Sequence, residues 1–119
     1  MLVEDDPFIA DIYQEKLNRE GLELKVVNDG KNAVTVIKQD KPDILLLDIV
    51  LPGIGGWQIL RELKKDGLLK KMKVIVLSNL GQQEEVAKGL EMGAARYLIK
   101  AQFTPAEVVD EIKKIISNQ

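Results

Sequence analysis

The chain has 119 residues, and its 17 basic and 19 acidic side chains give a formal net charge of −2. Nucleic-acid-binding domains typically carry an excess of basic residues, and this chain does not. We therefore expect no direct nucleic-acid contact. Cysteine and histidine are both absent, which excludes disulfides, thiolate or histidine metal sites and histidine-based catalytic triads. Any chemistry must therefore use carboxylates, hydroxyls and amines.

The amino-terminal segment predicts a short strand and an amphipathic helix. Residues 1–3 are apolar, and Asp6 followed by Pro7 predicts a helix start with Asp6 as the N-cap. The apolar residues that follow recur at helical spacing and should face the core. They are Ile9, Ile12, Tyr13 and Leu17.

The next segment predicts two strands separated by a helix. Residues 22–26 alternate apolar and charged side chains, which predicts a strand with one polar face at a sheet edge. A turn at 28–30 and a helix that ends at Pro42 follow. Residues 44–47 are continuously apolar, which is typical of a strand buried on both faces, and this run ends at Asp48.

The second half of the chain repeats the alternation. After a glycine-containing loop at 51–56 and a third helix, the apolar run 74–77 predicts a strand that ends at Ser78. We expect a helix over about residues 82–92. Its predicted inner face consists of Val86, Ala87 and Leu90.

The last unit consists of a short strand and a capped helix. The apolar run 97–99 ends at Lys100, and residues 104–107 (TPAE) form a capping box with proline at the first helical position. The predicted core face of this helix consists of Val108, Val109, Ile112, Ile115 and Ile116.

Five alternating strand–helix units, without a linker or repeat, predict one α/β domain over residues 1–119. Right-handed crossovers make this a three-layer α/β/α sandwich around a five-stranded parallel sheet. The apolar runs reach only about five residues, against the roughly 20 that cross a bilayer, and no signal-peptide pattern opens the chain. We therefore expect a cytoplasmic protein without membrane insertion.

Polar side chains follow four of the five predicted strands. In open α/β sheets ligands bind outside the carboxyl ends of the strands, so these groups should meet at one rim. Any one of them alone is more often a cap or a solvated strand end, but the full set indicates a site. The residues are Glu4, Asp5, Asp48, Ser78 and Lys100.

These residue types favour phosphoryl chemistry. Carboxylates crowded together must share protons or bind a cation, and an all-oxygen site that leaves room for a phosphate oxygen suits Mg²⁺. Lys100 supplies a positive charge and Ser78 a hydroxyl donor for phosphoryl oxygens. A carboxylate beside Mg²⁺ and lysine is equipped to become an aspartyl phosphate.

Over essentially its whole length, the chain resembles the receiver domain of two-component response regulators. Five motifs in this order and spacing carry the resemblance: residues 2–7 (LVEDDP), 42–48 (PDILLLD), 51–53 (LPG), 74–78 (VIVLS) and 93–100 (GAARYLIK). The resemblance implies a flavodoxin-like fold with strand order 2-1-3-4-5. It also implies a signalling module that catalyses only its own phosphorylation and dephosphorylation, and no external reaction.

The resemblance also implies a role for each site residue. Asp48 would accept a phosphoryl group from a histidine kinase or phosphotransfer protein, and Ser78 and Lys100 would bind the phosphoryl oxygens. Asp5, Asp48 and the backbone carbonyl of Val50 would hold Mg²⁺, with Glu4 contributing through water.

Ser78 and Tyr97 would act as the switch residues that the family uses. They would reshape the surface of the fourth helix, fifth strand and fifth helix, where a downstream protein, an output domain or a second copy binds.

Departures from the family pattern give further expectations. Ala101 stands where the family has a cis-proline, and a cis bond before another residue costs about 2.5–4 kcal/mol, so we expect Lys100–Ala101 to be trans. Asn79 is larger than usual and narrows access to the site. Val50 and Leu80 cannot orient a water molecule, which predicts slow self-dephosphorylation. These departures leave one alternative open, a receiver-like scaffold that acts by protein contact without phosphorylation.

Overall fold

Alternating strands and helices build the structure, a computed structural model that describes residues 1–51 and 53–117. The strands are β1 (Leu2–Val3), β2 (Val26–Val27), β3 (Ile44–Leu47), β4 (Lys73–Ser78) and β5 (Arg96–Ile99). The helices are α1 (Pro7–Arg19), α2 (Gly30–Asp40), α3 (Gly56–Lys65), α4 (Gln83–Glu91) and α5 (Pro105–Ser117), with 3₁₀ turns η1 (Leu68–Lys70) and η2 (Lys100–Gln102). Pro52 of the 51–53 motif and the last two residues of the predicted domain lie outside the described residues.

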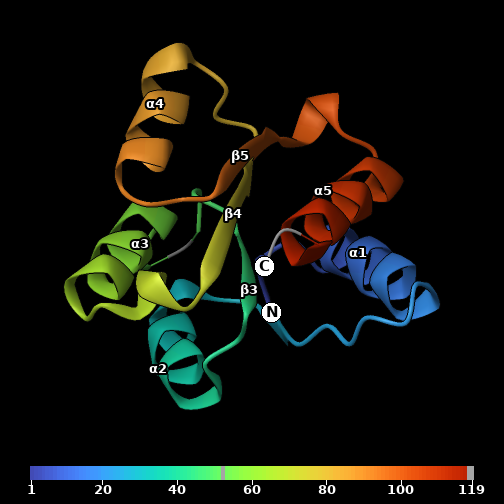
Figure 1. The fold of residues 1–119 in the computed structure, drawn as a ribbon, viewed down its shortest axis with the longest axis horizontal. Helices are drawn as coiled ribbons and strands as arrows, with labels where there is room; N and C mark the ends of the chain where they lie inside the picture. Colours follow the sequence, from blue (N-terminus) through green and yellow to red (C-terminus); the bar gives the residue numbers. More distant parts are fainter. Residues whose placement is uncertain (52, 118–119) are drawn as a thin grey trace.

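The strands form one parallel sheet in the order β2-β1-β3-β4-β5. Helices α1 and α5 cover one face of the sheet, and α2, α3 and α4 lie on the other (Figure 1). This arrangement confirms the predicted three-layer sandwich and its strand order.

The hydrophobic core is divided between the two faces of the sheet. Along β3, Leu46 packs with α1 and α5, whereas Leu45 and Leu47 pack with α2 and α3. All three side chains are fully buried, as expected for a central strand of a parallel sheet. The continuous apolar run therefore predicted both the strand and its burial on both faces.

The predicted helix starts are confirmed by their hydrogen bonds. The Asp6 carboxylate accepts from the backbone N–H groups of Phe8 (2.9 Å) and Ile9 (3.4 Å). At α5, Glu107 accepts from the Thr104 N–H (2.9 Å), and Thr104 Oγ1 accepts from the Glu107 N–H (3.2 Å). The Lys100–Ala101 bond is trans, as predicted, because no peptide bond of the described residues is cis.

The second predicted strand is shorter than the alternation indicated. Only Val26 and Val27 pair with β1, because β1 itself offers just two residues for pairing. Leu22 and Leu24 lie outside β2, and they pack as partly buried residues against the core beneath α1 and α5. The alternation over residues 22–26 therefore predicted correctly that the apolar side chains face the core, but it overestimated the length of the strand.

Three predicted helix faces differ in detail. Ile12 of α1 and Ile116 of α5 are about half exposed, because these helices reach the core through neighbouring positions such as Ala10 and Ile115. The prediction for α4 was wrong: Ala87 and Leu90 are exposed and Val86 is only half-buried. In α4 only Gly89 is fully buried, since this helix lies over β5 at the sheet edge.

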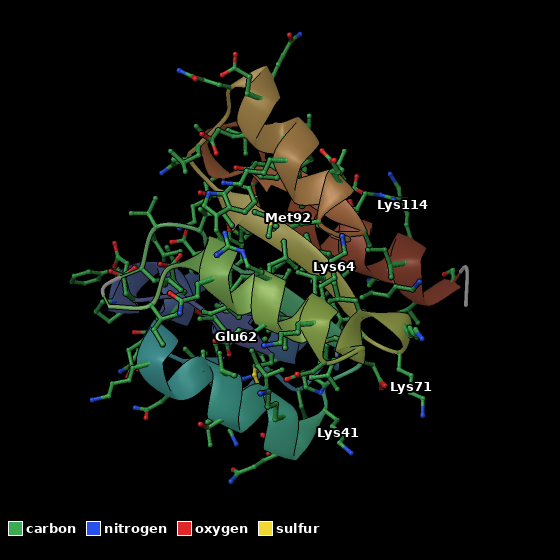
Figure 2. All side chains as sticks on the ribbon, turned by 90° about the vertical axis from the view of Figure 1, so that its left-hand side faces the viewer. Lys41, Glu62, Lys64, Lys71, Met92 and Lys114 are labelled. Carbon is green, nitrogen blue, oxygen red and sulfur yellow. The ribbon has the colours of Figure 1, made fainter. Side chains whose placement is uncertain are left out.

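Figure 2 shows the outer side of α2, α3 and α4 with their side chains. Lys41, Lys64 and Lys71 are exposed on this side of the molecule. Within residues 1–51 and 53–117, no helix has the length and apolarity needed to cross a membrane.

Candidate functional site

The carboxyl ends of the central strands place the acidic residues side by side. Glu4 follows β1 and donates its backbone N–H to Val27 O of β2 (3.0 Å). Asp48 follows β3 and donates its backbone N–H to Val3 O of β1 (3.1 Å). Since parallel strands end at the same edge, the side chains of residues 4, 5 and 48 meet there.

The three carboxylates form a compact oxygen cluster. One carboxylate oxygen from each of Glu4, Asp5 and Asp48 lies within 4.8 Å of the others. Glu4 and Asp48 are buried, whereas Asp5 is exposed to solvent. A partly open, all-oxygen set suits a hard divalent cation that keeps some of its water, and Mg²⁺ has these preferences. The residues present therefore fit the predicted Mg²⁺ site.

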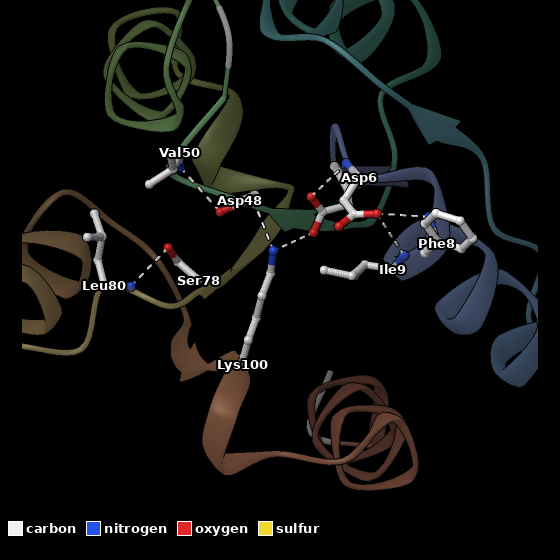
Figure 3. Close-up of polar contacts among 9 residues, drawn as sticks. Asp6, Phe8, Ile9, Asp48, Val50, Ser78, Leu80 and Lys100 are labelled. Atoms are coloured by element: carbon white, nitrogen blue, oxygen red, sulfur yellow. Dashed lines mark hydrogen bonds and ion pairs between the residues drawn. The ribbon is translucent and has the colours of Figure 1, made fainter.

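Lys100 reaches the same cluster from the end of β5 (Figure 3). Its ammonium donates to the carboxylates of Glu4 and of Asp48, the latter at 3.0 Å between Nζ and Oδ2. Burial raises the pKa of the Glu4 carboxyl, although the hydrogen bond from Lys100 acts in the opposite direction. Burial alone would lower the pKa of the Lys100 ammonium, but its bonds to the two carboxylates outweigh burial and leave that pKa raised.

Ser78 and Tyr97 are connected through Leu80, because each of them forms a hydrogen bond with its backbone. Ser78 is fully buried at the end of β4, and its hydroxyl oxygen accepts from the Leu80 backbone N–H (3.3 Å; Figure 3). The Tyr97 hydroxyl donates to the Leu80 carbonyl oxygen (2.5 Å). One residue of the β4–α4 loop thus joins a hydroxyl at the strand ends to the ring beneath α4.

The loop after Asp48 folds back tightly over the site. Val50 donates its backbone N–H to Asp48 Oδ1 (3.3 Å), and its side chain is 61% exposed. Gly56 donates its N–H to Ile49 O (2.8 Å). A Cβ at Gly56 would lie 2.3 Å from the Asp48 carbonyl oxygen, so only glycine allows this approach.

The structure brings Glu4, Asp5, Asp48 and Lys100 into one cluster, with Ser78 at the neighbouring strand end. The Lys100–Glu4 ion pair was not predicted from the sequence, where Lys100 was assigned to phosphoryl oxygens and Glu4 to Mg²⁺. The connection through Leu80 was not predicted either, because it uses backbone groups and therefore leaves no trace in residue type.

Comparison with known sequences tests the expected resemblance. The sequence model of the response regulator receiver domain matches residues 1–113 of this chain. The chain belongs to the response-regulator receiver family. It is 34% identical over 113 residues to the DNA-binding response regulator MtrA of Mycolicibacterium smegmatis, covering 95% of this chain and 48% of that protein. The receiver chain thus spans about half the length of this relative.

Solved receiver structures share the fold. A Francisella response regulator receiver domain superposes with a TM-score of 0.91 at 28% identity, covering 98% of this chain and 94% of that one. The BeF₃-activated amino-terminal receiver domain of RstA from Klebsiella pneumoniae gives a TM-score of 0.85 at 31% identity, covering 94% and 92% of the two chains. The receiver fold and the family assignment therefore agree.

Proposed function

We propose that this receiver domain accepts a phosphoryl group on Asp48 in a Mg²⁺-dependent reaction and signals through the surface of α4, β5 and α5. The observation that carries the proposal is the contact of Lys100 with Asp48 inside a cluster of three carboxylates. An ammonium beside a buried carboxylate, next to a cation site, matches the needs of phosphoryl transfer to that carboxylate.

The proposed reaction transfers the phosphoryl group between two nucleophiles. An oxygen of the Asp48 carboxylate attacks phosphorus, the new O–P bond gives an acyl phosphate, and the P–N bond of a phosphohistidine donor breaks. The imidazole nitrogen leaves with the electron pair of that bond and takes a proton from water. The donor is a histidine kinase or a phosphotransfer protein, as is typical of the family.

The chain's own groups would stabilise the charge that spreads over the phosphoryl oxygens. The Lys100 ammonium, which contacts Asp48, would donate a hydrogen bond to one of these oxygens. The Ser78 hydroxyl accepts from Leu80 and would donate its own proton to another phosphoryl oxygen. Asp5, Asp48 and the Val50 carbonyl would hold Mg²⁺, with Glu4 acting through water. When bound, Mg²⁺ neutralises charge on the phosphoryl oxygens and on the clustered carboxylates.

The proposed output is a change at the surface that contains Tyr97. Ser78 and Tyr97 bind the same residue, Leu80, so a movement of the Ser78 hydroxyl toward the phosphoryl group reaches the ring beneath α4. A downstream protein, an output domain or a second copy would recognise the altered α4–β5–α5 face. In this role the domain, over residues 1–119, turns over no external substrate.

Reductive trapping tests the proposal. Borohydride reduces an aspartyl phosphate to homoserine, and peptide mass spectrometry then locates the modified residue. After incubation with phosphoramidate and Mg²⁺, we expect homoserine at position 48 and none when Mg²⁺ is chelated. Homoserine at another carboxylate would contradict the assignment of Asp48 as the acceptor. Homoserine at no position would favour the scaffold that acts without phosphorylation.

A further inference from the structure

Gly30, the first residue of α2, packs directly against the backbone of the β3–α3 loop (residues 48–55). A Cβ added at Gly30 would lie 1.8 Å from the carbonyl oxygen of Ile54 and 2.9 Å from its carbonyl carbon. Even a close carbon–oxygen contact in proteins is about 3.3–3.6 Å. The φ angle of Gly30 is not positive, so space rather than backbone conformation requires glycine at this position.

The loop is the side of this contact that can move. Ala33, three residues further along α2, is completely buried. The start of the helix is capped, because the Asn32 N–H donates to the Asp29 carboxylate (2.7 Å). Ile54, in contrast, is only half-buried. A side chain in place of Gly30 should therefore displace the Ile54 carbonyl and leave α2 in position.

The Ile54 end of the loop is connected to the backbone beside Asp48. Gly56, two residues after Ile54, donates its N–H to Ile49 O (2.8 Å). Its Cα packs on the same backbone, since an added Cβ would lie 2.6 Å from Ile49 Cα. The next residue, Val50, donates its N–H to Asp48 Oδ1 (3.3 Å). A shift at Ile54 therefore passes through Gly56 to Val50, whose carbonyl is proposed above to bind Mg²⁺.

We propose that Gly30 is a positioning residue for the cation. By leaving room for the Ile54 carbonyl, it keeps the β3–α3 loop in the shape that allows the Val50 carbonyl to bind Mg²⁺. The proposal deepens the function proposed above and rests on it. It assigns a part in metal affinity to a residue of α2 that has no ligand group of its own. The expected effect is on cation binding and not on the reactivity of Asp48 once the cation is bound.

Calorimetric titration of the metal-free domain with Mg²⁺ tests the proposal. We expect Gly30→Ala to raise the dissociation constant about tenfold or more, the lower end of the loss that follows removal of a support to a metal ligand. The matched control is Gly55→Ala, which adds the same methyl group to the loop itself. An added Cβ there would lie 3.5 Å from Ile49 O, an ordinary contact, and the φ angle of Gly55 is −76°. The control should therefore stay within about twofold of the original dissociation constant, well below the loss from a disturbed ligand.

Ile54→Ala tests the same anchor from the side of the loop. The Ile54 side chain packs against the core cluster that contains Ala33, so its truncation loosens the segment that Gly30 accommodates. We expect weaker Mg²⁺ binding in this variant. In its background Gly30→Ala should add little, because substitutions of residues in contact are not additive. Urea unfolding shows whether each variant is folded, and Ile54→Ala decides the question if Gly30→Ala is not.

Amide NMR of the metal-free domain gives a second readout that needs no cation. Gly30→Ala should shift the resonances of Val50 and Gly56, whose N–H groups make the bonds that close the loop. The amide of Val109, buried in the core on the other face of the sheet, should remain in place. With Mg²⁺ raised well above the new dissociation constant, phosphoramidate should still modify Asp48 in Gly30→Ala.

The possible failures are distinguishable. If the unaltered domain does not bind Mg²⁺, the metal site itself is wrong, and the role of Gly30 is overturned with it. If the domain binds Mg²⁺ but folded Gly30→Ala or Ile54→Ala binds it equally well, the positioning role alone is wrong. A loss of affinity as large in Gly55→Ala, or one that leaves the Val50 amide in place, would also overturn that role. Failure of Gly30→Ala to modify Asp48 at saturating Mg²⁺ would assign the effect to the acceptor rather than to the cation.

Discussion

The ammonium of Lys100 lies 3.0 Å from the carboxylate of Asp48, although β4 separates the strands that these residues follow. Lys100 spans this distance because its long side chain extends from η2 across the end of β4 to the cluster. The same ammonium also binds Glu4. One cation therefore balances two buried carboxylates, and this arrangement determines how the domain should respond to mutation, pH and Mg²⁺.

Removing the Lys100 charge should destabilise the metal-free domain. Lys100→Met leaves the carboxylates of Glu4 and Asp48 buried without their cation, a change that typically costs about 3–5 kcal/mol. Urea unfolding at neutral pH in the presence of a chelator measures the loss. Lys65→Met, at an exposed position of α3, is the control and should change the free energy of unfolding by less than about 0.5 kcal/mol.

The loss should depend on pH in a defined direction. Burial raises the pKa of Glu4, and the variant lacks the lysine that opposes this rise. A carboxyl whose pKa is higher in the folded state holds more protons there, so its contribution to stability falls as pH rises through that range. The difference between Lys100→Met and the original protein should therefore shrink as the pH falls toward about 4.3, the ordinary glutamate pKa. If the stability difference between the two proteins grew on acidification instead, the loss would not come from a buried, ionised Glu4 carboxylate.

Mg²⁺ should stabilise the folded domain through the exposed member of the cluster. At a Mg²⁺ concentration of about 100 times its dissociation constant, binding adds about 2.7 kcal/mol to the free energy of unfolding. Asp5→Asn should abolish most of this gain with little effect on the metal-free protein, because Asp5 is exposed. Asp11→Asn, exposed on α1, should retain the full Mg²⁺ effect. Equal stabilisation of both variants in thermal melts would place the cation elsewhere.

The capping box of α5 should contribute measurably to stability. Thr104→Ala removes the oxygen that accepts the Glu107 N–H, and the loss of such an N-cap typically costs about 1 kcal/mol. Thr35→Ala, exposed in the interior of α2, is the matched control and should be neutral or slightly stabilising, since alanine is the best helix former. Chemical denaturation of both variants measures the difference, and equal stabilities would show that the cap is dispensable.

The lifetime of the phosphoryl group should be limited by the apolar side chains of Val50 and Leu80. The combined change Val50→Asn and Leu80→Glu introduces groups that can orient a water molecule. We expect phosphoryl loss to accelerate roughly tenfold or more, short of the 10²–10⁴-fold of full general acid–base catalysis. Val50→Ala, which adds no hydrogen-bonding group, should leave the half-life near that of the original domain. An unchanged half-life in the double variant would assign the slow loss to another cause.

The fold could be predicted from the sequence because most strands and helices have a local signal of their own. Asp6 with Pro7 and the Thr104–Glu107 box begin helices by local chemistry, and the continuous apolar run of β3 predicted a strand buried on both faces. The strand order itself came from the family resemblance. The clustering of Glu4, Asp5, Asp48 and Lys100 followed from the common edge at which parallel strands end.

The remaining features depend on contacts that residue types do not encode. The extent of β2 is set by the two residues that β1 offers for pairing, and the inner face of α4 is set by a ring from β5. Gly89 gave no periodic signal, because apolar periodicity does not register a glycine that is buried against an aromatic ring. Leu80 joins Ser78 and Tyr97 through backbone atoms, which any residue would supply.

The most direct test of phosphorylation at Asp48 is the intact mass of the domain after incubation with phosphoramidate and Mg²⁺, with Asp48→Asn as the control. We predict the addition of one phosphoryl group that is absent from the variant and absent when Mg²⁺ is removed. An unchanged mass in the original protein, or an equal gain in Asp48→Asn, would contradict the account.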